Sequence, residues 1–295
     1  MRFDWYQATI WDNNTHAIET IAKLGHELRD CDGLARAYRY NQGWQVLHKD
    51  LGAVATILVG GNGGNVHAFA SSDATDAFVD LVRTEYEGKH LVTRMDAAQD
   101  FNEAGAFMKL RRTCKRVAVA HRLGFQRIQD NLNPEAGRTQ YIGSKKSDHF
   151  GRLYEKGWEQ ANKCKPLFPG FKPGMLQSIT NTVTGEQVKP ADWVRLELQV
   201  RPQGEEARRV ASSATPEQAW GFTAWSHELA KEAMAIDLER IYIRTKKVSK
   251  DEEAMRWMCK QYGGMLSRTQ SDLGDWACVG LEIGKIIKEQ ASRCA

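Results

Sequence analysis

The stretch between Tyr141 and Gln160 combines side chains that phosphodiester chemistry needs. It reads YIGSKKSDHFGRLYEKGWEQ and places Tyr141 and Tyr154 among basic residues. The cationic side chains are Lys145, Lys146, Arg152, Lys156 and, if protonated, His149. A tyrosine hydroxyl can attack phosphorus, and neighbouring cations neutralise the phosphate under attack. The alternative is a solvated β-hairpin whose tyrosines cover the edge of a sheet.

Three segments are predicted strands with one polar face each, namely TRMDAAQDF, GRLYEKGW and WVRLELQVR. Alternate side chains of a strand share a face. If the three strands are neighbours in one antiparallel sheet, their polar faces converge. Carboxylates from the first and third would then lie beside the tyrosine and bases of the second. The converging residues are Asp96, Asp100, Glu197, Arg152, Tyr154 and Lys156.

Adjacent carboxylates repel one another, which is costly unless a cation lies among them. Carboxylate oxygens are the usual ligands of Mg²⁺ and Mn²⁺, and such a metal polarises a phosphate. A free phenol has a pKa of about 10, so on the order of one thousandth is phenolate at pH 7. We expect Lys156, Arg152 or the metal to favour the phenolate of Tyr154. The alternative is an ordinary solvent-facing strand surface of mixed charge.

Two further groups of residues are candidates for contacts with DNA. The turn between the two tyrosines carries Ser144, Lys145, Lys146 and Ser147, whose donors and charge suit phosphate contacts. The predicted helix 101–123 gathers Lys109, Arg112 and Arg116 on one face. A polar hairpin tip and a solvated helix face are the respective alternatives.

Composition limits the class of protein. The chain has 295 residues and a formal net charge of +4, so basic character can act only locally. No apolar run approaches the roughly 18 residues of a membrane span, and the N-terminus has no signal-peptide core. The six cysteines form no Cys-x-x-Cys pair. We therefore expect a cytoplasmic protein with reduced thiols and no membrane partner.

The pattern of elements predicts an α+β fold. Strand-like and helix-like stretches alternate in residues 1–208, which we expect to form an antiparallel sheet with flanking helices. The polar segment PQGEEARRVASSAT is predicted to be a linker. The segments 216–236 and 250–262 and the chain from about residue 271 are predicted helices, with Thr215 and Pro216 starting the first. Residues 209–295 are thus expected to form a smaller helical C-terminal domain.

The three polar strands also carry a resemblance. TRMDAAQDF, TQYIGSKKSDHFGRLYEKGWEQ and WVRLELQVR, with DWYQATI near the N-terminus and MRWMCKQYGGML near the C-terminus, are similar to segments of the replication initiation factor family. This family includes initiators of rolling-circle plasmids, replication proteins of filamentous phages and relaxases of some integrative conjugative elements. The resemblance spans nearly the whole chain.

The resemblance implies a metal-dependent nickase in the cytoplasm of a bacterial host. A tyrosine would cut one strand at a replication origin, single-stranded or in a hairpin, and keep the 5′ phosphate. The free 3′ hydroxyl would prime synthesis by host polymerase, with a host helicase. On this chain the nucleophile would be Tyr154, with Tyr141 as the rival.

Asp96, Asp100 and Glu197 would hold Mg²⁺ or Mn²⁺. The histidines include no His-x-His pair, so carboxylates must replace histidine ligands. A homodimer on an inverted repeat is a further expectation. Two other functions stay open, namely a relaxase for conjugative transfer and an origin-binding protein that does not nick.

Overall fold

The computed structural model describes residues 1–61, 63–163, 172–242 and 250–293, without the side chains of residues 250, 252, 253 and 291–293. The chain divides into two compact units, residues 1–244 and 245–295. The first unit contains a sheet and its helices. The second consists of α9 (Lys250–Leu273) and α10 (Trp276–Arg293).

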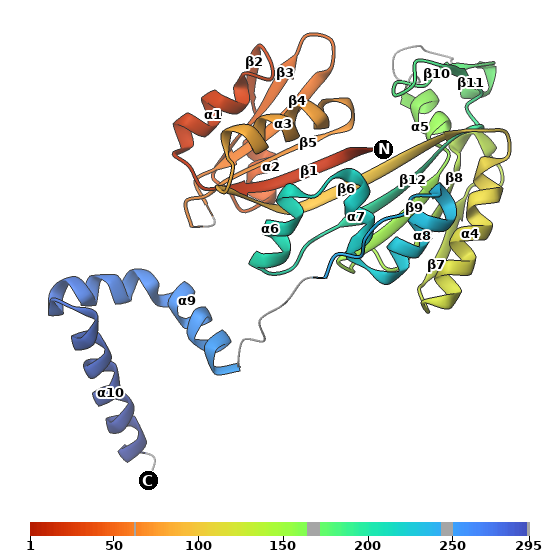
Figure 1. Cartoon of the computed structure of the whole chain (residues 1–295). Coiled ribbons are helices and arrows are strands. Elements are labelled where there is room, and N and C mark those ends of the chain that lie inside the picture. The colour runs from red at the N-terminus through yellow and green to blue at the C-terminus, as the bar shows by residue number, and fades with distance from the viewer. Residues whose placement is uncertain (62, 164–171, 243–249, 294–295) are drawn as a thin grey trace. The chain divides into compact units, whose positions relative to one another are not determined.

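A 10-stranded sheet forms the frame of the first unit, and its strand pairs are antiparallel (Figure 1). The predicted α+β class with an antiparallel sheet is therefore confirmed. In spatial order the strands are β2 (Glu27–Asp30), β3 (Gln42–His48), β4 (Gly52–Val59), β5 (Val66–Ser71), β1 (Arg2–Ile10), β6 (His90–Asn102), β12 (Trp193–Val200), β9 (His149–Tyr154), β8 (Arg138–Ile142) and β7 (Phe125–Gln129).

The helices of this unit are α1 (Asn14–Ala22), α2 (Asp32–Ala37), α3 (Thr75–Glu85), α4 (Ala106–Ala120), α5 (Lys156–Lys163), α6 (Glu205–Ser213), α7 (Pro216–Ala219) and α8 (Ala224–Met234). Strands β10 (Ile179–Thr180) and β11 (Gln187–Val188) form a small separate sheet. Thr215 caps α7 in a capping box with Gln218, and Pro216 occupies its first turn, as predicted.

One face of the sheet carries the hydrophobic core. Alternate residues of β1, Tyr6, Ala8 and Ile10, are fully buried there. The same cluster includes buried residues of α1, α3, α4 and α8, among them Phe78 and Phe107. Because these helices cover one face, the polar residues of the central strands gather on the opposite face.

That opposite face is partly covered at one end. Tyr38, which follows α2, stacks on Phe69 of β5, and Phe69 stacks on Trp5 of β1. The register of β1 against β6 shifts between Phe3 and Trp5, which indicates a bulge. The bulge lets Asp4 and Trp5, consecutive residues, both contact groups on this face.

The boundary between the compact units differs from the one expected near residue 208. The segment predicted as a linker forms α6, whose Ala207 and Ala211 are buried. Ser212 donates a hydrogen bond to the carbonyl of His90 and accepts one from the N–H of Val92, both on β6. Since α6, α7 and α8 pack on the sheet, the boundary falls after residue 244.

Within the described residues, no helix combines the length and the apolar character that crossing a bilayer requires.

Candidate active site

The three polar strands are neighbours in the sheet, as predicted. β12 lies between β6 and β9. Glu197 of β12 lies opposite Arg152 of β9 and Ala98 of β6, and Arg195 lies opposite Tyr154 and Asp100. Acidic and basic side chains from three separate segments therefore meet on one face.

Tyr154 and Arg152 bind the same carboxylate. The Tyr154 hydroxyl donates to Oε2 of Glu197 at 3.2 Å, while Arg152 forms an ion pair with Oε1. The Glu197 side chain is 1% exposed, and that of Arg152 is 34% exposed. Arg152 also lies 3.5 Å from Oδ2 of Asp96, so its one guanidinium faces two carboxylates.

Burial governs the protonation of this group. It raises the pKa of Glu197 to about 7, with help from the nearby Asp96 and against the effect of Arg152. Burial, and then the charge of Glu197, hold the pKa of the Tyr154 phenol well above its ordinary value. The expectation that Arg152 or Lys156 would favour the phenolate is therefore wrong, because Arg152 is paired with Glu197 and Lys156 with Glu159. The same effect expected of a metal stays a prediction. Tyr154 needs a proton acceptor, and Glu197 contacts it.

Asp100 lies in a different ion pair from the other predicted metal ligands. Arg195, which is fully buried, binds both of its oxygens at 2.6 and 2.7 Å. The remaining terminal nitrogen of Arg195 donates to Asp4 at 2.6 Å. Burial alone would raise the pKa of Asp4, but Arg195, Lys156 and Arg2 outweigh it and lower that pKa. This assembly is structural in character.

The predicted metal site of three carboxylates does not form. Asp96 is held by Arg94 at 2.9 and 2.5 Å as well as approached by Arg152, and Asp100 is committed to Arg195. Within the described residues no three His, Cys, Asp or Glu side chains group as metal ligands. Of the three predicted ligands, Asp96 and Glu197 are the two that contact the same side chain, Arg152.

Lys156 does not continue the strand face of Tyr154, contrary to the prediction. β9 ends at Tyr154, and Lys156 begins α5. Its buried ammonium pairs with Glu159 at 2.8 Å and lies 5.6 Å from the centre of the Tyr154 ring. Lys156 therefore contacts the ring of the candidate nucleophile, but its charge is engaged by Glu159.

Tyr141 of β8 lies opposite Arg152, on the same face as Tyr154. Its ring packs against Phe150 and is covered by the Lys145 ammonium at 4.2 Å. Among the described residues no hydrogen-bond partner is found for its hydroxyl. A pocket of about 210 Å³ opens here, lined by Tyr141, Lys145, Phe150, Arg152, Gln199 and Arg201.

The turn between β8 and β9 uses its serines internally. Ser144 accepts from the N–H of Lys146, and Ser147 donates to the carbonyls of Ser144 and His149. Lys145 and Lys146 are exposed. The serines thus shape the turn, while the lysines are the groups left for a phosphate.

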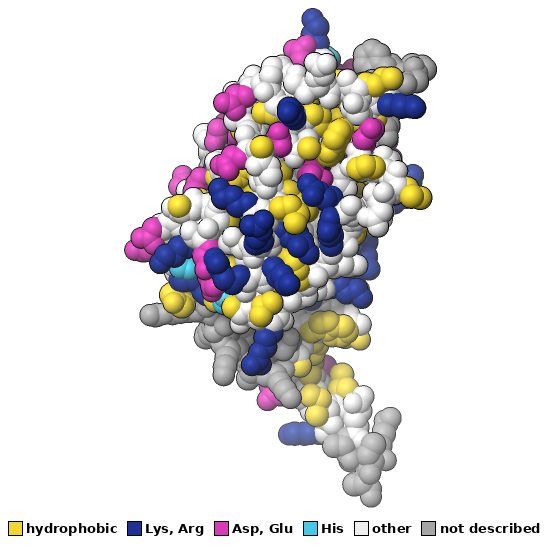
Figure 2. Space-filling view, turned by 90° about the vertical axis from the view of Figure 1, so that its right-hand side faces the viewer, with side chains coloured by type: hydrophobic (Ala, Val, Ile, Leu, Met, Phe, Trp, Pro, Cys, Tyr) yellow, Lys and Arg dark blue, Asp and Glu magenta, His cyan; other side chains and the backbone are white. Residues whose placement is uncertain are grey.

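The basic residues predicted on the long helix lie on α4, behind the sheet. Figure 2 shows lysine and arginine side chains gathered over the side of the molecule that carries α4. Lys109 pairs with Glu103, and Arg116 pairs with Glu232. Arg112 is exposed and has no acidic partner among the described residues. This surface faces away from Tyr154.

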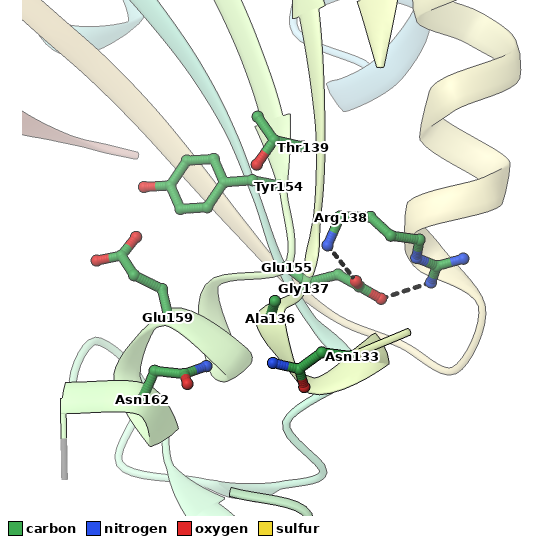
Figure 3. Close-up of a pocket in the computed structure, with 9 residues that line it drawn as sticks. All are labelled: Asn133, Ala136, Gly137, Arg138, Thr139, Tyr154, Glu155, Glu159 and Asn162. Atoms are coloured by element: carbon green, nitrogen blue, oxygen red, sulfur yellow. Dashed lines mark hydrogen bonds and ion pairs between the residues drawn. The ribbon is translucent and has the colours of Figure 1, made fainter. Parts of the chain in front are cut away.

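A second pocket, of about 360 Å³, includes Tyr154 in its lining (Figure 3). It is lined by Asn133, Ala136, Gly137, Arg138, Thr139, Tyr154, Glu155, Glu159 and Asn162. Sequence reasoning missed Asp4, Arg195, Glu159 and these asparagines as site residues. Arg195 was on the identified polar face, whereas nothing in the sequence placed residues 133 and 162 together.

No family model matches the chain, and no curated protein matches its sequence. Among solved structures, its fold is similar to that of a rolling circle replication initiator protein from Geobacillus stearothermophilus, with a TM-score of 0.47 and 17% identity. The similarity covers 85% of this chain and 89% of that chain.

The pairing of Asp100 with Arg195 predicts a structural effect. Asp100→Ala leaves the buried guanidinium short of an acidic partner, so we expect the free energy of unfolding to fall by about 3 kcal/mol. Urea denaturation measures it. Glu205→Ala, which breaks an exposed pair with Arg209, is the control and should cost less than about 1 kcal/mol. Equal losses in both variants would contradict the structural role of Asp100.

Proposed function

We propose that this chain is a DNA strand transferase that nicks an origin and starts rolling-circle replication, with Tyr154 as the nucleophile. One observation carries the proposal: the Tyr154 hydroxyl donates to Glu197, whose other oxygen is held by Arg152. A nucleophile in contact with a base that a third group orients is the arrangement that activates a hydroxyl. Among the residues that the structure describes, no such base contacts Tyr141.

The proposed step transfers the 5′ phosphate from a 3′ oxygen of DNA to the phenol oxygen of Tyr154. The Tyr154 oxygen attacks phosphorus while its proton passes to Oε2 of Glu197. The bond from phosphorus to the 3′ oxygen breaks, and the 5′ phosphate stays on the tyrosine. The departing 3′ oxygen takes a proton from water and becomes the free 3′ hydroxyl that primes synthesis.

Cations for the phosphate are close to the nucleophile. Arg152 is partly exposed and lines the smaller pocket together with Lys145 and Arg201. Lys145 and Arg201 have no acidic partner among the described residues, whereas Arg152 is paired with Glu197. A phosphate at this position would meet the two free cations beside Arg152, and they would stabilise the charge that develops during attack.

The same chemistry would serve a conjugative relaxase. We propose replication as the function. Its partners would be origin DNA, a host helicase and a host polymerase, in the cytoplasm of a bacterial cell. Ser144 to Ser147 and the α4 residues Lys109, Arg112 and Arg116 would add sequence-independent contacts to phosphates. A homodimer would match an inverted repeat at the origin.

Replacing the nucleophile provides the first test. Tyr154→Phe removes the attacking oxygen and keeps the ring, so we expect nicking to fall at least about a thousandfold while DNA binding persists. Supercoiled DNA carrying the element's own intergenic region is scored for open circles and for protein that withstands detergent. Tyr141→Phe is the matched control and should keep nicking. A covalent adduct formed by Tyr154→Phe would overturn the assignment.

The role of Glu197 predicts a pH dependence. Glu197 accepts a proton only when ionised, so nicking should rise with pH and level off above about 7. Glu197→Gln should lower the rate by about a hundredfold or more and remove this dependence. Because the folded pKa lies above the ordinary 4.5, the free energy of unfolding should fall between pH 4.5 and about 7. An unchanged rate profile in Glu197→Gln would contradict the base role.

Mg²⁺ or Mn²⁺ belongs to the proposal. Asp96 and Glu197 would be its ligands in place of their contacts with Arg152, and the metal would supply positive charge to the phosphate. We expect EDTA to abolish nicking and Asp96→Asn to raise the metal concentration required about tenfold or more. Asp100→Asn should leave the metal titration unchanged, since Arg195 holds Asp100. Full nicking in EDTA would remove the metal from the proposal.

A further inference from the structure

The two pockets that flank the nucleophile have opposite chemistry. Arg152 and Tyr154 lie two residues apart on β9, roughly 7 Å along one strand face. Arg152 lines the pocket that contains Lys145 and Arg201, whereas Tyr154 lines the larger pocket of about 360 Å³. A phosphate under attack by Tyr154 would therefore lie between the two pockets.

The larger pocket is unsuited to a phosphate. Glu155 and Glu159 line it, and like charges repel. The basic side chain in its lining, Arg138, is bound to Glu155 (Figure 3). Lys156, next to it, is bound to Glu159. No lining cation in the described part of the chain is left for an anion.

Its polar groups suit a neutral, planar ligand. Asn162 uses its amide N–H groups on the carbonyls of Glu135 and Trp158, at 2.8 and 2.7 Å, which leaves its oxygen as an acceptor. The side chains of Thr139 and Asn133 have no hydrogen-bond partner among the described residues. The volume lies at the small end of the range for ligand pockets, about 300 to 1,000 Å³.

We propose that this pocket receives an unpaired base of single-stranded DNA next to the scissile phosphate, and that it favours a base with an exocyclic amino group, namely adenine, cytosine or guanine, over thymine. Carboxylate and amide oxygens accept hydrogen bonds from these amino groups, which thymine lacks. The inference rests on the proposed function. It adds a reading of base identity to a site where the phosphate contacts carry none.

The wall of the pocket supports a rigid, shaped site. Gly137 adopts a φ of +77°, and a Cβ at this position would lie 3.2 Å from Cβ of Trp158 on α5. The turn before β8 therefore packs closely on α5. Both elements are fixed against the end of β9, where Tyr154 lies.

The test uses binding by the Tyr154→Phe protein, which keeps the ring and cannot cut. Short fluorescein-labelled single strands with randomised sequence are selected on this protein and sequenced. We expect one position at which the bases with an amino group are preferred to thymine by about tenfold. Adding Asn133→Ala and Thr139→Val should remove this preference, while the matched control Asn131→Ala, in the same turn but outside the pocket, should keep it.

Two results would overturn the inference: no base preference at any position, or the same preference after the pocket substitutions. Circular dichroism checks that the substituted proteins are folded, and Thr139→Val alone serves if the double variant is not. The outcome is distinguishable from failure of the proposed function. A wild-type protein that never nicks would refute the nickase, yet its base preference would still be measurable. A protein that nicks without preference would refute the pocket alone.

Discussion

The buried guanidinium of Arg195 is the constraint on which the arrangement of this site depends. It is fully buried on β12 and binds Asp100 of β6 and Asp4 of β1. A buried charge without partners is strongly destabilising, so these strands can pair only in a register that supplies both carboxylates. The same register places Tyr154 opposite Arg195 and Glu197 opposite Arg152. The register that pairs Arg195 with its two carboxylates thus also places Tyr154 beside Glu197.

This arrangement also decides how the acidic side chains are balanced. Arginines from the same face neutralise them, with Arg94 on Asp96, Arg152 on Glu197 and Arg195 on Asp100. Arginine suits this task because its planar fork binds a carboxylate through two donors. Arg152 differs from Arg195 in being partly exposed, so it can contact a substrate without leaving a sealed core.

Strand periodicity predicted the part of the site that regular strands build. Parity placed Asp96, Arg152, Tyr154 and Glu197 on one face, and the structure brings them together there. It failed where regularity ends. β9 ends at Tyr154, so Lys156 belongs to a helix. The bulge in β1 places Asp4 on the face opposite to the one that strict alternation predicts. The strands β2, β3 and β7 and the helix α6 were not predicted. The side chains of β2 and nearly all of those of β7 are exposed, so these strands lack the apolar alternation that predicts a strand. The contacts of α6 with β6 are non-local, and a single segment does not reveal them.

The contrast between the two pockets follows from the elements that build them. Arg152 and Arg201 project from or beside strands whose outward positions are polar, and the β8–β9 turn adds Lys145. The other pocket is closed by α5 and the turn before β8, whose cations are bound to Glu155 and Glu159. A single strand of DNA has the same division, since its phosphates need cations and its bases need neutral donors and acceptors. Tyr154 stands where the two surfaces meet, so a strand bound in this way would present the phosphate, and not the base, to the phenol oxygen.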